Sequence, residues 1–492
     1  MENYLEASPY LDQPANRDTQ LLIRGSVAIM TGKLGEQARA QGGDIRVKNG
    51  VIDAIGNLTP EAGEEVLDAS GCVVYPAWVN THHHLAQSLL KAVPEGINST
   101  LTPWLSAVPF RFRSCFDENL LRTAARIGLI ELALSGCGTV ADHHYMYWPG
   151  MDFDGAQILF EEAARLGLRF VLCRGGATRS RHFEKCTSDV ESLSDYLDDI
   201  SRLQRDFHED RTYAMRRVVV APTTVMFSMD PGELREVAAH ARSLGLHMHS
   251  HLSETVIYQE ASQKNYDCSP IRFAEKTNWL GPDVWYAHLV KLDLPEIEML
   301  GATNTGIAHC PQSNGRLASG IAPVRALADA GVTVSLAVDG AGSNEAADML
   351  QEVHAAWLMG RARAGQSALP TYLGGRGEQG ADSVTVEEVI HWGTAGGAKV
   401  LGLHDTATLE PGRVADIAIY ELNQPRHMGM HDLAVAPIVC GGATVRSLLV
   451  AGKKVVENGK IPGMDMSELS EAARSGVSLL QKLALSDWGK TK

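Results

Sequence analysis

The sequence has little that would direct the chain out of the cell or into a membrane. Its first residues, M-E-N-Y-L-E, lack the basic and apolar segments of a signal peptide. No uninterrupted apolar run approaches the roughly 18 residues that a membrane-spanning helix needs. The eight cysteines are scattered without a C-x-x-C pair, which argues against a disulfide framework. We therefore expect a cytoplasmic protein without membrane association.

Positive charge is scarce as well. The chain has 44 lysines and arginines against 59 aspartates and glutamates, which gives a net charge of −15. Proteins that bind nucleic acids are usually basic, because contacts with phosphate supply most of their affinity. The charge balance therefore argues against a nucleic-acid partner and favours a small neutral substrate. The composition leaves open whether the chain forms a homo-oligomer.

Short strand-like runs occupy both ends of the chain, within residues 20–75 and 416–450. Asn49 and Gly50 separate two of the early runs, which is a strong hairpin signal. Neither end looks able to close a sheet alone. The sequence therefore predicts one small composite β-sandwich domain formed by both chain ends, followed by a helical tail. The predicted segments are 1–75 and 411–465 for the β-domain and 466–492 for the tail.

The middle of the chain, 76–410, alternates buried strands with helices. Helical patterns such as 119–135, 155–166, 232–244 and 322–330 separate the strand candidates. The strand candidates are eight apolar runs: 72–81, 138–144, 169–175, 217–223, 247–252, 284–290, 305–310 and 333–339. This order predicts an α/β fold, a (β/α)8 TIM-like barrel. A doubly wound sheet is the alternative, but the sequence has no Gly-rich phosphate loop to support it.

Polar clusters follow or end several of these strands. They are N-T-H-H-H at 80–84, H-S-H-L-S-E at 249–254, A-H at 287–288 and V-D-G at 338–340. Catalytic residues of such barrels lie at the carboxyl ends of the strands. Together the clusters supply three imidazoles and a carboxylate for one metal, with a Glu and a His left to move protons. An H-x-H pattern alone is weak evidence, but the joint set is typical of metal-assisted hydrolysis.

The alternation of side chains along a strand indicates which of the histidines can reach a metal. Side chains two residues apart point to the same face, so His82 and His84 can both face the barrel axis while His83 points away. By the same rule His249 shares a face with His251 but lies one layer below it. We therefore expect only His251 of this pair to reach a metal.

These motifs resemble those of the amidohydrolase superfamily, in particular its mononuclear deaminase branch with guanine, cytosine and adenosylhomocysteine deaminases. The matching stretches are 76–87, 251–254, 309–314, 338–344 and 411–416. Relatives with two metals bridge them with a carboxylated lysine that ends strand 4. The corresponding residues here, Val220 to Thr224, contain no lysine, so the resemblance implies one metal.

The resemblance also implies a role for each residue. Zn²⁺ is the expected metal, and Fe²⁺ is the alternative, because nitrogen and oxygen ligands do not separate the two. The metal would activate a water, Asp339 would also take a proton, and His288 would orient or deprotonate the water. Glu254 would protonate the ring nitrogen beside the carbon under attack, so that ammonia leaves. The implied ligands are His82, His84, His251 and Asp339.

Gln87 points to the substrate class, because one amide can both donate to and accept from a lactam edge. The chain looks closest to the group that deaminates 8-oxoguanine and the pterin isoxanthopterin. Members that act on 8-oxoguanine carry a cysteine motif at the end of strand 4, where this chain has Pro222-Thr223-Thr224. We therefore predict a fused aminopyrimidinone substrate, with the pterin ahead of 8-oxoguanine or guanine.

Other candidate substrate contacts are less specific. Arg179 and Arg181 could meet the carbonyl of the second ring, or could be surface arginines. Trp104 and Tyr145 could stack on the substrate, or could be packed in the core. Two rival classes stay open: a triazine or thioether-nucleoside hydrolase, for which no ribose-binding groups are identified, and a structural homologue without a metal.

Overall fold

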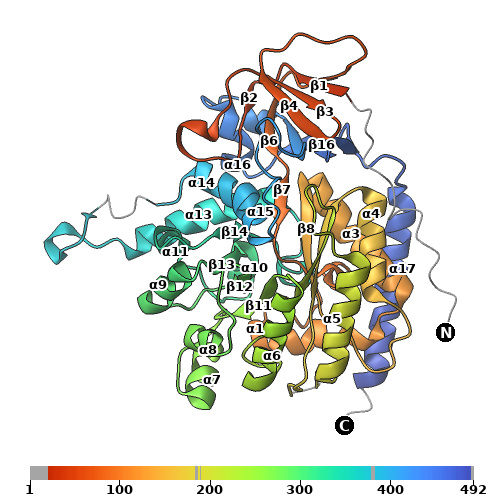
Figure 1. Cartoon of the computed structure of the whole chain (residues 1–492), viewed down its shortest axis with the longest axis vertical. Coiled ribbons are helices and arrows are strands. Elements are labelled where there is room, and N and C mark those ends of the chain that lie inside the picture. The colour runs from red at the N-terminus through yellow and green to blue at the C-terminus, as the bar shows by residue number, and fades with distance from the viewer. Residues whose placement is uncertain (1–19, 183–186, 189, 378–382, 489–492) are drawn as a thin grey trace.

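The computed structural model describes residues 20–182, 187–188, 190–377 and 383–488. Figure 1 shows two parts: β-sheets from both chain ends at one end of the molecule, and a barrel surrounded by helices beneath them. In the described residues no helix has the length and hydropathy to cross a membrane.

The barrel is a sheet of eight parallel strands in the order β14-β13-β12-β11-β10-β9-β8-β7. Its two edges meet where the Thr81 amide donates to Leu336 O (3.3 Å) and the Val338 amide donates to the Asn80 side chain (3.0 Å). The predicted (β/α)8 barrel is thereby confirmed. The strands are β7 (Trp78–Asn80), β8 (Cys137–His144), β9 (Arg169–Arg174), β10 (Arg216–Val220), β11 (Met248–Leu252), β12 (Val284–His288), β13 (Gly306–His309) and β14 (Val334–Leu336).

Helices cover the outside of the barrel and begin at residues that cap them. The Asp117 side chain accepts from the Leu120 amide at the start of α3, and Asp154 accepts from Gln157 at the start of α4. The predicted helices agree with these elements to within about two residues. The principal outer helices are α3 (Glu118–Leu134), α4 (Gly155–Leu166), α5 (Leu193–Phe207), α6 (Pro231–Ser243), α7 (Val256–Tyr266), α8 (Pro270–Lys276), α9 (Leu294–Ala302), α11 (Val324–Asp329) and α13 (Met349–Ser367).

Shorter helices fill the loops at the carboxyl ends of the strands. The segment after β7 forms η2 (Leu85–Leu89), α1 (Leu101–Ala107) and α2 (Pro109–Phe112). After β13 and β14 the chain forms α10 (Pro311–Arg316) and α12 (Ala341–Asn344). Two of the four polar motifs, 80–84 and 338–340, lead into these short helices, whereas 249–254 and 287–288 lie on or directly after β11 and β12.

The single strand predicted over 72–81 is wrong, because the run contains two strands in different sheets. β6 (Cys72–Pro76) pairs with β15 (Ile417–Glu421), whereas β7 pairs with β8. The change of partner falls at Ala77, whose amide donates to Asp416 O (2.9 Å), while the next amide, of Trp78, donates to Gly136 O (2.9 Å). An apolar run that is buried throughout gives no signal of such a change.

The last barrel strand also ends earlier than predicted. The sequence indicated 333–339, but β14 stops at Leu336. Asp339 has a left-handed backbone (φ +62°), which a strand cannot include. This turn directs the Asp339 side chain toward the histidines after β7.

The β-domain combines both chain ends, as predicted. One sheet has the order β4-β3-β1-β5, and the other, β17-β16-β15-β6-β2, mixes early and late segments. Apolar side chains of both sheets, including Ile23, Ile45, Val74 and Ile417, share one buried core. The remaining strands are β1 (Gln20–Arg24), β2 (Ala28–Ile29), β3 (Asp44–Lys48), β4 (Val51–Gly56), β5 (Glu65–Asp68), β16 (Thr444–Val450) and β17 (Lys453–Glu457).

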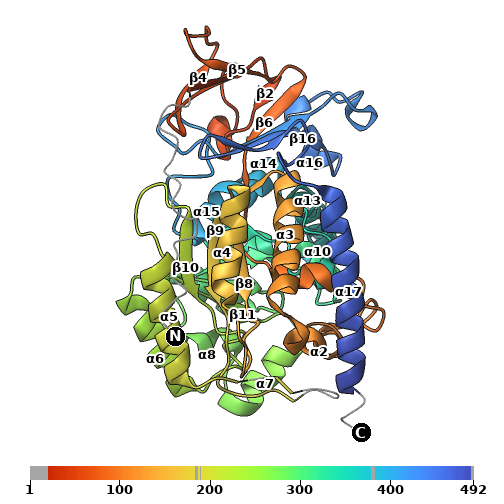
Figure 2. The ribbon, with the colours of Figure 1, turned by 90° about the vertical axis from the view of Figure 1, so that its right-hand side faces the viewer.

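The predicted Asn49-Gly50 hairpin joins β3 to β4, with φ of +53° and +77° at the two turn residues. The tail forms α17 (Met466–Trp488), which runs along the barrel beside α3 (Figure 2). A Cβ at Gly476 would come within 3.0 Å of Leu120, so the two helices approach closely there. We keep 1–75, 76–410, 411–465 and 466–492 as proposed segments, of which 1–19 and 489–492 lie outside the described residues.

We predict that ionisation of Glu352 on α13 lowers the stability of the chain as pH rises toward about 8. Its fully buried carboxyl accepts from the Gln312 amide (3.0 Å) and side chain (2.5 Å), and burial raises its pKa from 4.5 to about 8. Because the folded chain holds this proton more tightly than the unfolded chain, stability falls as pH rises from about 4.5 to about 8. Across this range the unfolding temperature of Glu352→Gln should fall less than that of the wild type.

The matched control is Glu298→Gln, a surface substitution on α9. Its unfolding temperature should follow the wild-type pH dependence. Identical pH profiles for Glu352→Gln and the wild type would contradict the prediction.

Candidate active site

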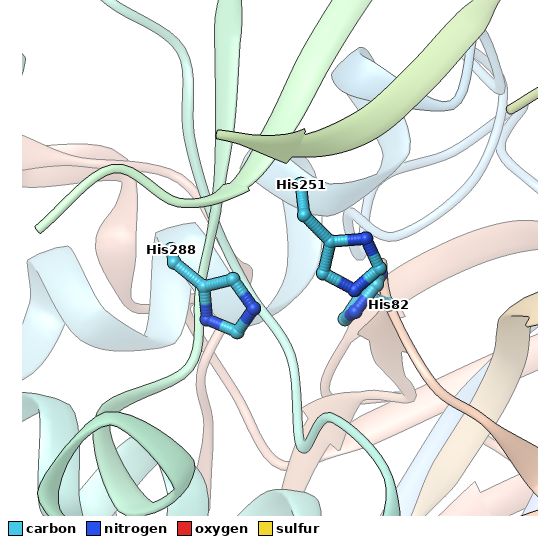
Figure 3. Close-up of side chains that lie close together, drawn as sticks. All are labelled: His82, His251 and His288. Atoms are coloured by element: carbon cyan, nitrogen blue, oxygen red, sulfur yellow. The ribbon is translucent and has the colours of Figure 1, made fainter. Parts of the chain in front are cut away.

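The residues singled out in the sequence gather at the carboxyl ends of the barrel strands. His82 and His84 follow β7, His251 lies on β11, His288 ends β12 and Asp339 follows β14. His82, His251 and His288 turn their rings toward a common space (Figure 3). All of these residues are buried except His251, which is partly exposed.

Main-chain carbonyls fix the tautomers of two of these imidazoles. His84 Nδ1 lies 2.7 Å from His143 O, and His251 Nδ1 lies 2.6 Å from Thr223 O. A carbonyl can only accept, so each Nδ1 carries the hydrogen and each Nε2 presents a lone pair. Burial lowers the pKa of both rings, which favours the neutral form.

The Nε2 atoms of these histidines and Asp339 Oδ1 lie close together. Asp339 Oδ1 lies 3.3 Å from His82 Nε2 and 3.4 Å from His84 Nε2, and His84 Nε2 lies 3.3 Å from His251 Nε2. His82 Nε2 is buried without a hydrogen-bond partner. Atoms with lone pairs at such distances repel one another unless a cation lies between them. The set therefore fits a divalent metal, and nitrogen and oxygen donors suit Zn²⁺ or Fe²⁺.

Asp339 is held by donors on both of its oxygens. Ser313 Oγ (2.6 Å) and Ser343 Oγ (3.1 Å) donate to Oδ2, and the Gly340 amide (2.7 Å) donates to Oδ1. These donors favour the ionised carboxylate. Asp339 and His288 both have left-handed backbones (φ +62° and +78°), conformations that cost energy and cluster at functional sites.

Glu254 lies beside His288 at the edge of the same space. Ser319 Oγ donates to its Oε1 (3.1 Å), and its Oε2 lies 3.8 Å from His288 Nε2. Asn314 Oδ1 is 2.9 Å from His288 Nδ1, so this ring also presents its Nε2 to the site. Burial raises the pKa of Glu254, which keeps a proton on it closer to neutral pH. The arrangement supplies a proton donor next to a proton acceptor.

A pocket opens onto these groups, and the space between its lining atoms, part of it open to solvent, is about 690 Å³. Its walls combine the polar cluster with aromatic and aliphatic side chains. The lining includes His84, His251, Glu254, His288, Asp339, Gln87, Tyr145, Arg181, Thr223, Thr224, Trp104, Leu101, Phe110, Phe227 and Ile257. His82 lies beneath this surface and is fully buried.

The hydrogen bonds of Gln87 define the polarity of one pocket wall. The Gly342 amide can only donate, and it lies 3.2 Å from Gln87 Oε1. Gln87 Nε2 therefore faces the Tyr145 hydroxyl, to which it donates (2.9 Å). Because that hydroxyl oxygen accepts from Gln87, its own hydrogen can be donated into the pocket.

The other predicted substrate contacts divide between the pocket and the surface. Arg181 lines the pocket with its guanidinium over the Phe227 ring (4.4 Å), and burial lowers its pKa. Trp104 also lines the pocket, and its indole nitrogen donates to Gly342 O (2.8 Å). Arg179 does not line it: its side chain is 45% exposed, lies 3.4 Å from Asp230 and is hydrogen-bonded to the Tyr266 hydroxyl (3.3 Å). Arg179 is therefore the one predicted contact that the structure separates from the site.

Two histidines near the centre were not recognised from the sequence as parts of it. His249 was expected to lie one layer below His251 and not to reach the metal; its Nε2 is 2.7 Å from His82 Nδ1. His143 on β8 is fully buried beside His84 and His251, and neither of its ring nitrogens has a hydrogen-bond partner. Strand alternation could have placed the His143 side chain inside the barrel.

Comparison with known proteins gives one consistent result. Residues 73–455 match the Amidohydrolase family. The chain is 58% identical over 469 residues to an isoxanthopterin deaminase from an unknown prokaryotic organism, covering 94% of this chain and 97% of that one. It is 32% identical to an 8-oxoguanine deaminase of Pseudomonas aeruginosa, covering 87% of this chain and 96% of the relative.

A solved structure extends the likeness to a protein with bound metal. It is an atrazine chlorohydrolase of Arthrobacter aurescens complexed with zinc, and it is 28% identical to this chain. The TM-score is 0.84, with 93% of this chain and 100% of that chain covered. Most of this chain thus shares its fold with a protein whose structure contains zinc.

We predict one tightly held metal per chain, lost on replacing His82, His84 or Asp339 by Ala. The reason is the convergence of their lone pairs on one point. The measurement is elemental analysis of purified protein. His83→Gln is the matched control, because the His83 ring lies toward Gly128 of α3 and does not line the pocket, so this variant should keep its metal. Two metals per chain, or none at full activity, would contradict the prediction.

Proposed function

Because the chain belongs to the amidohydrolase family, we propose that it hydrolytically deaminates a fused aminopyrimidinone, with isoxanthopterin as the preferred substrate. The strongest support is that one pocket is lined by the imidazole and carboxylate cluster, by the buried Glu254 and by the hydrogen-bonded pair Gln87 and Tyr145. The 58% identity to an isoxanthopterin deaminase over nearly the whole chain supports the substrate.

The proposed metal ligands are His82, His84, His251 and Asp339. Zinc is the proposed metal, supported by the zinc-bound relative, with Fe²⁺ as the alternative. A divalent cation bound there would lower the pKa of a coordinated water to about 7. The carbonyls that accept from His84 and His251 would keep both lone pairs directed at it.

His288, Asp339 and Glu254 divide the proton transfers. The Nε2 of His288 accepts a proton from the attacking water, because its Nδ1 hydrogen is held by Asn314. Asp339 assists as a second acceptor. Glu254 donates a proton to the ring nitrogen beside the carbon under attack. Water adds to that carbon, and the proton taken up by His288 passes to the amino group. The carbon–nitrogen bond then breaks, ammonia leaves, and the remaining hydroxyl proton goes to Asp339 as the carbonyl forms.

Substrate recognition uses donors on two sides of the pocket. The Tyr145 hydroxyl, with the second Nε2 hydrogen of Gln87, presents donors to the lactam carbonyl of the attacked ring. Arg181 presents a cation to the carbonyl of the second ring. Thr223 and Thr224 line the pocket where the second ring would lie.

The second candidate is deamination of 8-oxoguanine. This purine has the same lactam edge and a carbonyl on its second ring, so the same donors would serve it, and the 32% identical relative supports it. Because the shape of one ring contributes only a few kcal/mol of discrimination, overlap between pterin and purine is expected.

Replacing Glu254 by Gln should lower kcat by at least about 10²-fold, the usual scale of general acid–base catalysis. The amide keeps the size of the side chain but has no acidic proton to deliver. Metal content should stay near one per chain. Glu352→Gln is the control, because this buried glutamate does not line the pocket, and it should turn over normally. Near-normal turnover by Glu254→Gln would show that another group is the acid.

Ammonia release should be faster, by kcat/KM, from isoxanthopterin than from 8-oxoguanine or guanine. Tyr145→Phe should lower kcat/KM for isoxanthopterin by roughly tenfold, the scale of one hydrogen bond. The same substitution should have little effect on an analogue that lacks the lactam carbonyl.

Two results would count against this assignment. Faster release from guanine, cytosine or adenosine would refute the substrate while leaving the mechanism intact. An equal loss on both the substrate and the analogue would refute the role of Tyr145.

A further inference from the structure

His249 occupies the floor of the site. It lies on β11, two residues before His251, and is fully buried. Its ring stacks on Trp285 of β12, with centroids 4.5 Å apart and planes 15° apart. It does not line the pocket, so no direct contact with a substrate explains a polar ring there.

Two hydrogen bonds determine which nitrogen of the His249 ring carries the hydrogen. His249 Nδ1 lies 2.9 Å from Trp285 O, which can only accept, so Nδ1 carries a hydrogen. A neutral ring then has a bare Nε2, which lies 2.7 Å from His82 Nδ1. His82 must therefore carry its hydrogen on Nδ1 and present the lone pair of Nε2 toward Asp339. The opposite direction would need a second proton on a fully buried imidazole, a costly unpaired charge.

Trp285 links this ring to the main chain of the ligand. Its indole nitrogen donates to Thr81 O (3.2 Å), the carbonyl directly before His82. The carbonyl and the indole of one fully buried residue thus hold the His249 ring and the peptide that leads into His82. This contact connects β12 to the residue between the end of β7 and His82.

We infer that His249 is a positioning residue that holds His82 in the tautomer able to bind the metal. The inference rests on the proposed metal centre. Hydrogen bonds from a ligand histidine to a partner outside the coordination sphere typically change metal affinity by about 10–100-fold. Here the partner is a second imidazole, itself fixed by a carbonyl.

Two conservative substitutions separate this role from simple packing. His249→Asn places an amide near the position of Nδ1, which preserves contact with Trp285 O but leaves His82 Nδ1 without an acceptor. His249→Gln places its amide oxygen near the position of Nε2, where it can accept from His82. His309→Asn is the matched control, since His309 is also fully buried in the barrel and its ring has no hydrogen-bond partner.

The measurements are zinc affinity by competition with a chelator, the visible spectrum of the Co²⁺-loaded protein, and the unfolding temperature without metal. His249→Asn should bind zinc about 10–100-fold more weakly and change the Co²⁺ spectrum. His249→Gln should recover most of the affinity, and His309→Asn should keep it despite any loss of stability.

Wild-type affinity in His249→Asn would overturn the inference, as would equal losses in the Asn and Gln variants. A wild-type chain that binds no metal would instead refute the proposed metal centre. Should His249→Asn fail to fold, the ring ¹⁵N shifts of the zinc-loaded wild type decide. Hydrogens on Nδ1 of both His249 and His82 would support the inference, and a hydrogen on His249 Nε2 would overturn it.

Discussion

The convergence of bare imidazole nitrogens on one carboxylate oxygen is the constraint on which the rest of the site depends. Nitrogen lone pairs that face one another in a buried space repel unless a cation lies between them. The main-chain carbonyls of His143 and Thr223 hold His84 and His251 in this orientation. The barrel closes at the same place, where residues 80–82 at the end of β7 meet residues 336–339 at the end of β14. The fold and the proposed metal centre therefore depend on the same contacts.

The pocket holds two carboxyl groups in different surroundings, together with hydrogen-bond donors. Three hydrogen-bond donors favour the ionised form of Asp339. Glu254, whose Oε2 lies 3.8 Å from His288 Nε2, is buried, and burial raises its pKa. Two carboxylates in different surroundings can thus serve as acceptor and donor in one reaction. Gln87, which accepts from the Gly342 amide just after Asp339, and Tyr145 add hydrogen-bond donors that match a carbonyl. The proposed hydrolysis of the bond between a ring carbon and its amino group, beside a lactam carbonyl, would use both carboxyl groups and these donors.

Much of this could be predicted from the sequence because the relevant signals are local. Alternation on a strand predicted that His82 and His84 share a face, and Asn49-Gly50 predicted its hairpin. The predictions that failed concern contacts between residues far apart in the sequence. Nothing in the apolar run 72–81 indicates that its two halves pair in different sheets, and spacing alone could not separate Arg181 in the pocket from Arg179 at the surface. The contact of His249 with His82 joins residues 167 positions apart.

Anomalous diffraction at the zinc absorption edge, from crystals of the purified protein, tests the central claim most directly. We expect one peak per chain, surrounded by the Nε2 atoms of His82, His84 and His251 and by Asp339 Oδ1. A second peak, a peak held by His143 in place of His82, or no peak in a fully active protein would contradict it.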